Sequence, residues 1–152
     1  MLKVVKYSKK DFPQVLGIIE EVTNEWSAGW KNLVSEMFRN ENSCPFALER
    51  FVAKNEKEVV GLLVIKKEIC ASIIYFLAAR SGSRGKGIGS LLLKRAEEFA
   101  KNSKCSFLRV DVYYEFEKNK EFYLKNGFTE SGRVRNYYEL KDEQIFLFKK
   151  IR

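Results

Sequence analysis

The feature that most constrains this chain is a glycine-rich segment, Arg84–Ser90, that joins two apolar patterns of different period. The run Ile73–Ala79 is almost wholly apolar and predicts a strand that is buried on both faces. The run Ile88–Lys101 has apolar residues at helical spacing and predicts an amphipathic helix. Glycine lets backbone N–H groups approach a ligand, and a helix N-terminus adds unpaired donors and partial positive charge. With Arg84 and Lys86, the segment therefore predicts a cradle for a phosphorylated ligand.

Glycine spacing separates the known kinds of phosphate cradle. A Walker loop needs a lysine directly after its second glycine, and here Ile88 follows Gly87. A dinucleotide fingerprint fits Gly85 and Gly87, but Ser90 stands where its third glycine is needed. Asp111 lies at about the right distance for the ribose-binding acid of that fingerprint, so the dinucleotide interpretation stays open but weak.

A third pattern, [RQ]-x-x-G-x-[GA], is matched fully by Arg84, Gly87 and Gly89. It is the acetyl-CoA pyrophosphate loop of the GNAT family of N-acetyltransferases, which this chain resembles from Ser83 to Lys101. A second segment, Glu121–Phe128 (EFYLKNGF), resembles the C-terminal motif of that family. The two motifs stand in the family's order and spacing, and the predicted elements agree with the family over nearly the whole chain.

The resemblance implies how acetyl-CoA is bound. The pantetheine arm is expected to pair with the backbone of the strand end, and the pyrophosphate is expected on the N–H groups of the glycine-rich loop. An asparagine that often contacts the cofactor in the family is replaced by Phe116, and Asn119 is a candidate to take over part of that contact. The predicted cofactor-binding residues are Leu77, Ala78, Ala79, Arg84, Gly85, Lys86, Gly87, Ile88, Gly89, Ser90 and Asn119.

Tyr123 occupies the position of the family's tyrosine, which usually protonates the departing CoA sulfur. A phenol with a reference pKa near 10 stays protonated at pH 7 and can donate to a forming thiolate. The resemblance therefore implies that Tyr123 is the general acid. The alternative is a buried tyrosine that only packs on a short helix.

One departure from the family concerns the general base. Many members carry a glutamate on the strand before the loop, whereas Ser72–Leu77 contains no carboxylate; Asp111 and Glu115 are the remaining nearby acids. Neutralising a lysine side chain at pH 7 costs about 4.6 kcal/mol, and neutralising an α-amine costs about 1 kcal/mol. A site without a strong base therefore favours a peptide N-terminus or a small amine over lysine.

The acceptor side of the site is less well marked by the sequence. The family builds it from the helical region after the first strand and from the last hairpin. The predicted acceptor-binding residues are therefore Trp26, Trp30, Tyr137 and Tyr138. The alternative is that these aromatic residues only pack.

The net charge of +8 suggests an anionic ligand, nucleic acid or an acidic partner, or only a solvated basic surface. Tyr113, Tyr114 and Phe116, with neighbouring lysines, could stack on bases. Glu115 and Glu117 are interleaved with them, and no RNA-binding motif is visible, so nucleic-acid binding ranks last.

Residue types exclude several chemistries. The chain has no histidine and three distant cysteines, which argues against a zinc site, a Cys/His pair or a Ser-His-Asp triad, so no metal is expected. No apolar run approaches the roughly 20 residues that span a membrane, and Met1–Tyr7 alternates like a strand. We expect a cytoplasmic protein without membrane contact, and the resemblance allows a homodimer.

Periodicity predicts a mixed sheet flanked by helices, an α/β (α+β) chain in the order β-α-α-β-β-β-α-β-α-β-β, within a single domain of residues 1–152. The resemblance adds the GNAT fold, whose central strands splay apart and bind CoA. The predicted ranges are Leu2–Tyr7, Lys10–Asn24, a helix ending near Arg39, Arg50–Lys54, Glu58–Lys67, Ser72–Ala79, Ile88–Lys101, Phe107–Val112, Glu117–Asn126, a strand from Phe128, and a hairpin of Val134–Leu140 with Gln144–Ile151.

The resulting hypothesis is an enzyme, an N-acetyltransferase that moves an acetyl group directly from acetyl-CoA to a primary amine. A non-catalytic acyl-CoA-binding module of the same fold is the alternative, because the strand-borne carboxylate is missing.

Overall fold

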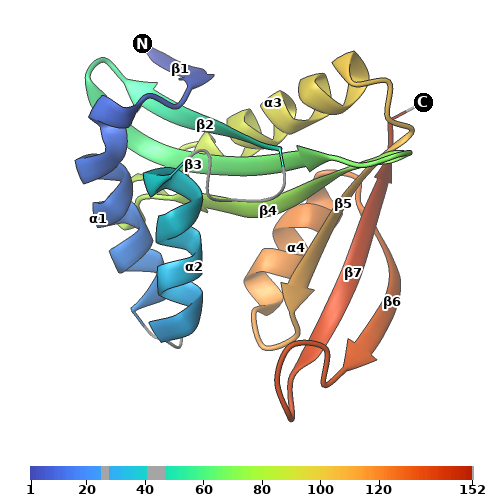
Figure 1. The fold of residues 1–152 in the computed structure, drawn as a ribbon. Coiled ribbons are helices and arrows are strands. Elements are labelled where there is room, and N and C mark those ends of the chain that lie inside the picture. Colours follow the sequence, from blue (N-terminus) through green and yellow to red (C-terminus); the bar gives the residue numbers. More distant parts are fainter. Residues whose placement is uncertain (25–27, 41–46, 152) are drawn as a thin grey trace. The chain divides into compact units, whose positions relative to one another are not determined.

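The computed structural model describes residues 1–24, 28–40 and 47–151, and its elements follow the predicted order (Figure 1). Trp26 lies outside the described residues. The strands are β1 (Leu2–Lys6), β2 (Leu48–Asn55), β3 (Glu58–Lys67), β4 (Ala71–Ala79), β5 (Phe107–Tyr113), β6 (Thr129–Arg135) and β7 (Glu143–Lys150). The helices are α1 (Phe12–Thr23), α2 (Ala28–Arg39), α3 (Ile88–Asn102) and α4 (Glu117–Lys125), with 3-10 turns at Lys9–Asp11 and Ser81–Ser83.

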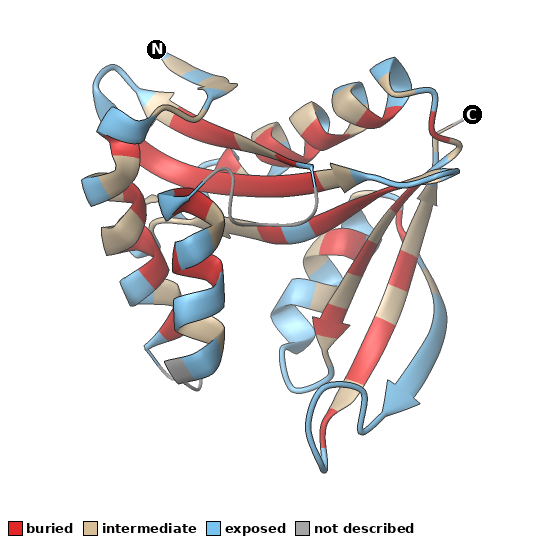
Figure 2. Cartoon of the chain, viewed as in Figure 1, coloured by how far each residue is buried: buried red, intermediate tan, exposed pale blue. Residues whose placement is uncertain are grey.

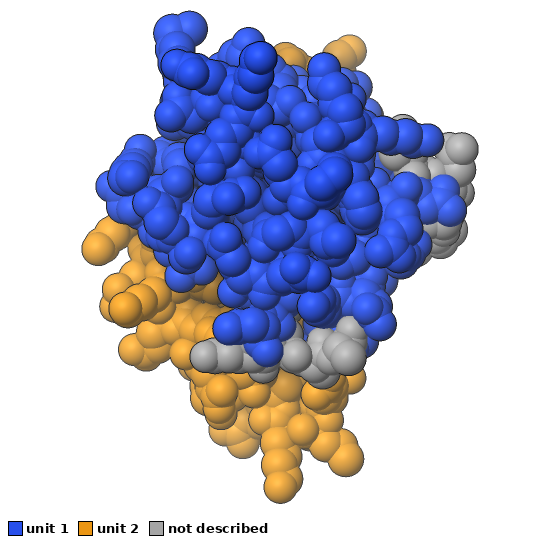
Figure 3. Space-filling model, turned by 90° about the vertical axis from the view of Figure 1, so that its left-hand side faces the viewer, with its two compact units in different colours: residues 1–66, 75–96 blue, residues 67–74, 97–152 orange. Residues whose placement is uncertain are grey.

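The strands hydrogen-bond in the order β1-β2-β3-β4-β5-β7-β6, and the β4–β5 pair is parallel. The pairs β1–β2, β2–β3, β5–β7 and β6–β7 are antiparallel, so the predicted mixed sheet is confirmed. The chain divides into two compact units, residues 1–66 with 75–96 (unit 1) and residues 67–74 with 97–152 (unit 2), coloured separately in Figure 3. β4 contributes its first four residues to unit 2 and the rest to unit 1.

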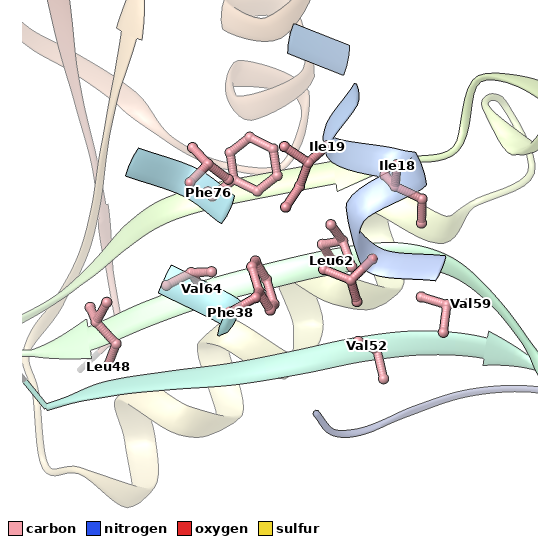
Figure 4. Close-up of a cluster of buried hydrophobic side chains, with 11 residues drawn as sticks. Ile18, Ile19, Phe38, Leu48, Val52, Val59, Leu62, Val64 and Phe76 are labelled. Carbon is pink, nitrogen blue, oxygen red and sulfur yellow. The ribbon is translucent and has the colours of Figure 1, made fainter. Parts of the chain in front are cut away.

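Unit 1 buries a hydrophobic core between α1, α2 and one face of its strands (Figure 2). Alternate residues of a strand point to opposite faces, so Leu62 and Val64 of β3 share the face that meets the helices. Ile19 from α1 and Phe38 from α2 are fully buried against this face (Figure 4). The remaining members of the cluster are Val15, Ile18, Val34, Leu48, Val52, Val59 and Phe76.

The other face of these strands packs on the first turns of α3. A Cβ added to Gly61 would lie 2.7 Å from Cγ2 of Ile88 and 3.0 Å from Cδ1 of Leu92, so only glycine allows this approach. The guanidinium of Arg95 lies 4.5 Å from the ring centroid of Phe51. The helix that follows the glycine-rich loop is therefore held directly on β3.

Unit 2 is built from β5, β6, β7 and α4, with the first residues of β4. Burial alternates along β5, where Leu108, Val110 and Val112 are buried, as the sequence predicts. Tyr123 of α4 packs edge-on against Phe128 at 5.2 Å between ring centroids. Gly127 follows α4 with φ +86°, the left-handed conformation typical of a glycine that caps the C-terminus of a helix.

One predicted element differs from the structure. The predicted strand Val134–Leu140 is wrong beyond Arg135, since residues 136–142 form the connection to β7. Asn136 and Lys141 have φ of +52° and +72°, which a continuing strand does not allow.

Candidate functional site

The glycine-rich loop joins β4 to α3 within unit 1, as predicted. Gly85 and Gly87 adopt φ of +75° and +79°, in the left-handed region where a side chain is strained. A Cβ added to either glycine would meet nothing within 4 Å, so backbone conformation and not crowding requires glycine here. The loop is exposed up to Gly87, and Ile88 is buried at the start of α3.

The start of α3 presents unpaired backbone donors. The first backbone hydrogen bond of the helix runs from Leu91 N–H to the Gly87 carbonyl at 3.0 Å. Within residues 1–24, 28–40 and 47–151, no backbone carbonyl accepts from the N–H groups of Ile88, Gly89 or Ser90. These donors, at the positive end of the helix dipole, are suited to an anionic oxygen.

A bulge in β3 anchors the beginning of the loop. Ala53 pairs with Gly61 and Lys54 with Val59, so Val60 is an extra residue in the ladder. The carbonyl of Val60 accepts a hydrogen bond from Arg80 N–H at 2.9 Å. The bulge therefore turns the Val60 carbonyl toward the chain that leads into the loop.

Glu21 is a residue at this site that the sequence analysis missed. Its carboxylate, on α1, accepts hydrogen bonds from the N–H and the hydroxyl of Ser81 at 3.0 and 3.1 Å. The bond from the Ser81 N–H, helped by its hydroxyl and by the charges of Arg80 and Arg84, holds the pKa of Glu21 below its ordinary value. Nothing local in the sequence links two segments so far apart, so no pattern could have revealed this contact.

Among the described residues, no strand is paired with the end of β4 on its β5 edge. Pairing with β5 covers Ala71 to Ile74 and stops there, while β4 continues to Ala79. The predicted pantetheine-binding residues Leu77, Ala78 and Ala79 lie in this continuation and are half-buried. They directly precede the loop in unit 1.

Tyr123, the predicted acid, lies in unit 2 and is 6% exposed. Burial, and to a lesser extent the charge of Asp111, raises the pKa of its phenol far above the ordinary value. The phenol therefore remains protonated at every physiological pH and can donate but not accept a proton. Asn119 lies in the first turn of the same helix with its side chain exposed.

Two of the predicted acceptor residues lie together in unit 2, in the β6–β7 connection. Tyr137 and Tyr138 stack edge-on with ring centroids 4.6 Å apart. Their N–H groups donate to the two carboxylate oxygens of Asp142 at 2.7 and 3.1 Å, which fixes the connection. The Tyr138 hydroxyl donates to Asp111 at 3.0 Å. Burial first, and then Asp111, raises the pKa of Tyr138.

Trp30, the other described acceptor candidate, lies in the first turns of α2 in unit 1 and is half-buried. α2 begins at Ala28, two residues before Trp30. Among the described residues, no cluster of histidine, cysteine, aspartate or glutamate could hold a metal ion. No helix in the described ranges is both long and apolar enough to span a membrane.

Comparison with known proteins identifies the family to which this chain belongs. A model of the acetyltransferase (GNAT) family matches residues 13–128, so this chain belongs to the GNAT family of acetyltransferases. The chain is 29% identical over 101 residues to an uncharacterised N-acetyltransferase of Methanocaldococcus jannaschii. That match covers 66% of this chain and 65% of the relative, so the chain spans slightly less than two thirds of its length.

Solved structures show the same fold. The ribosomal-protein-S18-alanine N-acetyltransferase of Escherichia coli superposes with a TM-score of 0.79 at 16% identity, over 99% of this chain and 94% of that one. An aminoglycoside 6'-N-acetyltransferase complexed with coenzyme A superposes with a TM-score of 0.76 at 16% identity, over 99% of this chain and 97% of that one. The predicted family and fold class are thereby confirmed.

Proposed function

We propose that this chain transfers an acetyl group from acetyl-CoA to a primary amine. Family membership supports the reaction class. The observation that supports the cofactor assignment is the loop of unit 1, where two left-handed glycines lead into α3 and no backbone carbonyl of the described residues accepts from the N–H groups of Ile88, Gly89 and Ser90. Backbone donors in such an arrangement are suited to an anion. The two GNAT structures compared above act on amines and one contains coenzyme A, which supports this choice of substrates.

The proposed cofactor site uses the backbone of Arg84 to Ser90 for the pyrophosphate. Hydrogen bonds to a charged group contribute roughly 1.5–3 kcal/mol each, so several N–H donors are expected to supply a substantial part of the binding free energy. Arg84 and Lys86 are exposed and add positive charge without fixing the geometry. The backbone of Leu77 to Ala79, whose ladder with β5 has ended, is available to pair with the amide groups of the pantetheine arm.

In the proposed reaction the amine nitrogen attacks the thioester carbonyl, a C–N bond forms and the C–S bond breaks. The sulfur leaves with its electron pair as a thiolate, the nitrogen loses its proton to water, and the thiolate is in turn protonated from water. Tyr123 is proposed to donate toward the sulfur. Because burial raises the pKa of Tyr123 above that of a thiol, complete transfer is uphill and the hydrogen bond itself supplies much of the stabilisation.

The acceptor is proposed to be an α-amine or a small amine. β4 carries no carboxylate to deprotonate an ammonium, so the amine must arrive neutral at modest cost. The cost is about 1 kcal/mol for an α-amine and about 4.6 kcal/mol for lysine at pH 7. The named substrates of the two compared structures, a protein alanine and an aminoglycoside, support amine acceptors of both kinds.

A non-catalytic acyl-CoA-binding module remains the second candidate, favoured by that missing carboxylate. The two are separated by following CoA thiol release with a thiol reagent, with and without an alanine-initiated peptide or a small amine. Amine-dependent thiol release and an acetylated product seen by mass spectrometry support the enzyme. Saturable acetyl-CoA binding with release no faster than in buffer, across an amine panel, would leave the binding module.

A further inference from the structure

An exposed group of aromatic side chains at one end of unit 2 has no role in the core. We call it the aromatic surface. Tyr114 and Phe116 are each 37% exposed, and Tyr137 and Tyr138 are 46% and 48% exposed. Tyr113 joins the first pair, with ring centroids 5.2 Å from Tyr114 and 5.5 Å from Phe116. Large aromatic residues left exposed in one place are typical of a binding surface.

Two segments distant in sequence build this surface. The first follows β5 and the second connects β6 to β7, and both lie at the same end of unit 2 (Figure 1). Tyr114 N–H donates to the Glu143 carbonyl at 3.0 Å, which joins the segments through their backbones. The bond from Tyr138 to Asp111 joins them again through side chains. The surface is therefore preformed.

Carboxylates surround these rings. Residues 111–117 and 136–144 contain one basic side chain, Lys141, and six acidic ones: Asp111, Glu115, Glu117, Glu139, Asp142 and Glu143. Of these acids, Glu143 lies 3.9 Å from both Arg133 and Arg135, so it is already paired. The charge of Arg109 also reaches Tyr138. The Tyr114 hydroxyl donates to a carboxylate oxygen of Glu115 at 3.1 Å, which places that acid beside the rings. Burial, and then the charges of Glu115, Asp142 and Glu139, raises the pKa of Tyr113. Glu115 and Glu139 are exposed, whereas Asp142 is committed to the turn.

The exposed aromatic rings and the neighbouring carboxylates together favour a cationic ligand. Aromatic faces attract ammonium groups through the ring quadrupole, and nearby carboxylates add to that attraction. A neutral apolar partner would leave the carboxylates unpaired, and an anionic partner such as nucleic acid would be repelled. Only a cationic ligand uses both features of the surface.

We propose that the aromatic surface binds the remote ammonium of a linear di- or polyamine, so that the preferred acceptor is a primary amine with a second positive charge several carbon atoms away. This inference rests on the proposed function, because it names the acceptor class of the same reaction. It is tested by a different measurement, namely the preference of the protein for one amine over another, and not by whether acetyl transfer occurs.

The test compares two amines of equal length, 1,6-diaminohexane and hexylamine. We expect kcat/KM to be at least about 10-fold higher for the diamine, since exposed ion pairs and cation–π contacts contribute roughly 2- to 5-fold each. Calorimetric titration of the CoA-saturated protein with each amine should show the same preference. Raising the salt concentration from about 0.05 to 0.5 M should reduce it by screening.

Variants assign the preference to the surface. Glu115→Gln with Glu139→Gln should lower kcat/KM for the diamine about 5-fold or more and change that for hexylamine less than about 2-fold. Tyr114→Leu should act in the same direction. Glu56→Gln removes an exposed carboxylate from the β2–β3 turn of unit 1 and should leave both values unchanged.

Equal kinetics and equal binding for the two amines would overturn the inference and leave the proposed function intact. So would a diamine preference that survives the double variant. A calorimetric preference for the diamine that the double variant removes, without acetylation of either amine, would keep the inference and refute the transferase.

Discussion

Unit 1 and unit 2 differ in how their ligand-binding features are encoded. Residues 1–66 and 75–96 hold 15 basic and 9 acidic residues, a net charge of +6, and include the proposed phosphate cradle. Residues 67–74 and 97–152 hold 13 basic and 11 acidic residues, a net of +2, and concentrate carboxylates around exposed tyrosines. The cradle is backbone within one short segment, whereas the aromatic surface is side chains from two segments. The overall charge of +8 therefore comes mainly from unit 1 and conceals the local group of carboxylates in unit 2.

The largest effect is expected from breaking the backbone cradle. Gly87→Glu places a side chain at φ +79° and a carboxylate beside the proposed pyrophosphate, so the Kd for acetyl-CoA should rise at least about 100-fold. Isothermal titration calorimetry measures this change.

Gly17→Glu is the matched control for that variant. Gly17 lies within α1 of the same unit, and a Cβ there meets nothing within 4 Å. Its Kd should match that of the wild type, and equal weakening by both variants would contradict the role of the loop.

The next largest effect concerns the chemistry assigned to unit 2. Tyr123→Phe removes the proposed donor to the sulfur and should lower kcat about 100-fold while leaving the Kd for acetyl-CoA within about 2-fold. Single-turnover kinetics measure the chemical step.

The pH profile provides the control for Tyr123. Because its pKa is raised by burial, wild-type kcat should show no fall on the alkaline side below about pH 10. An unchanged kcat in Tyr123→Phe would show that the tyrosine only packs.

The sequence predicts a site within one short segment better than a site built by segments that are distant in the chain. Arg84, Gly87 and Gly89 were enough to predict the loop, because a ligand bound by backbone N–H groups fixes glycine spacing over a few residues. Glu21 and the Val60 carbonyl could not be foreseen, since each contacts the loop from a distant segment.

In unit 2, a side-chain contact that local sequence patterns do not reveal made the prediction of the last hairpin partly wrong. Alternation predicted a strand over Val134–Leu140, but the Asp142 carboxylate binds the N–H groups of Tyr137 and Tyr138 and turns the chain there. Such side-chain capping of backbone donors competes with strand formation and leaves no periodic signal. Tyr137 and Tyr138 were chosen as candidates, yet their contact with Asp111 was visible only in the structure.

A smaller effect on acetyl-CoA binding is expected from Glu21, which contacts the start of the loop in unit 1. Glu21→Ala removes both hydrogen bonds to Ser81 and should loosen the start of the loop, raising the Kd for acetyl-CoA about 5-fold. Glu21→Gln keeps an acceptor oxygen and should recover most of that loss. If both variants bind as the wild type does, the contact has no role in organising the loop.

The smallest effect is on the stability of unit 2. Glu130 pairs with Arg133 at 2.6 Å and Lys120 at 2.7 Å, and these contacts lower its pKa to about 2. A carboxylate with a lowered folded-state pKa stabilises the fold above its ordinary pKa of 4.5 and loses that contribution as the pH falls toward 2. Glu130→Gln should therefore lower the free energy of unfolding by about 1 kcal/mol at pH 7.

Chemical denaturation at several pH values measures the Glu130 effect. The difference between wild type and Glu130→Gln should shrink below pH 4.5. A difference that stays constant down to about pH 2 would mean that packing, and not ion pairing, carries the effect.

The central claim, that the loop backbone of unit 1 binds the phosphates of acetyl-CoA, is tested most directly by NMR. Amide resonances of ¹⁵N-labelled protein would be followed during titration with acetyl-CoA. The account predicts saturable shifts that are largest at Gly85, Gly87, Gly89 and Ser90, because hydrogen bonding to phosphate changes an amide directly. Binding that leaves these four amides unshifted, or no binding at all, would contradict it.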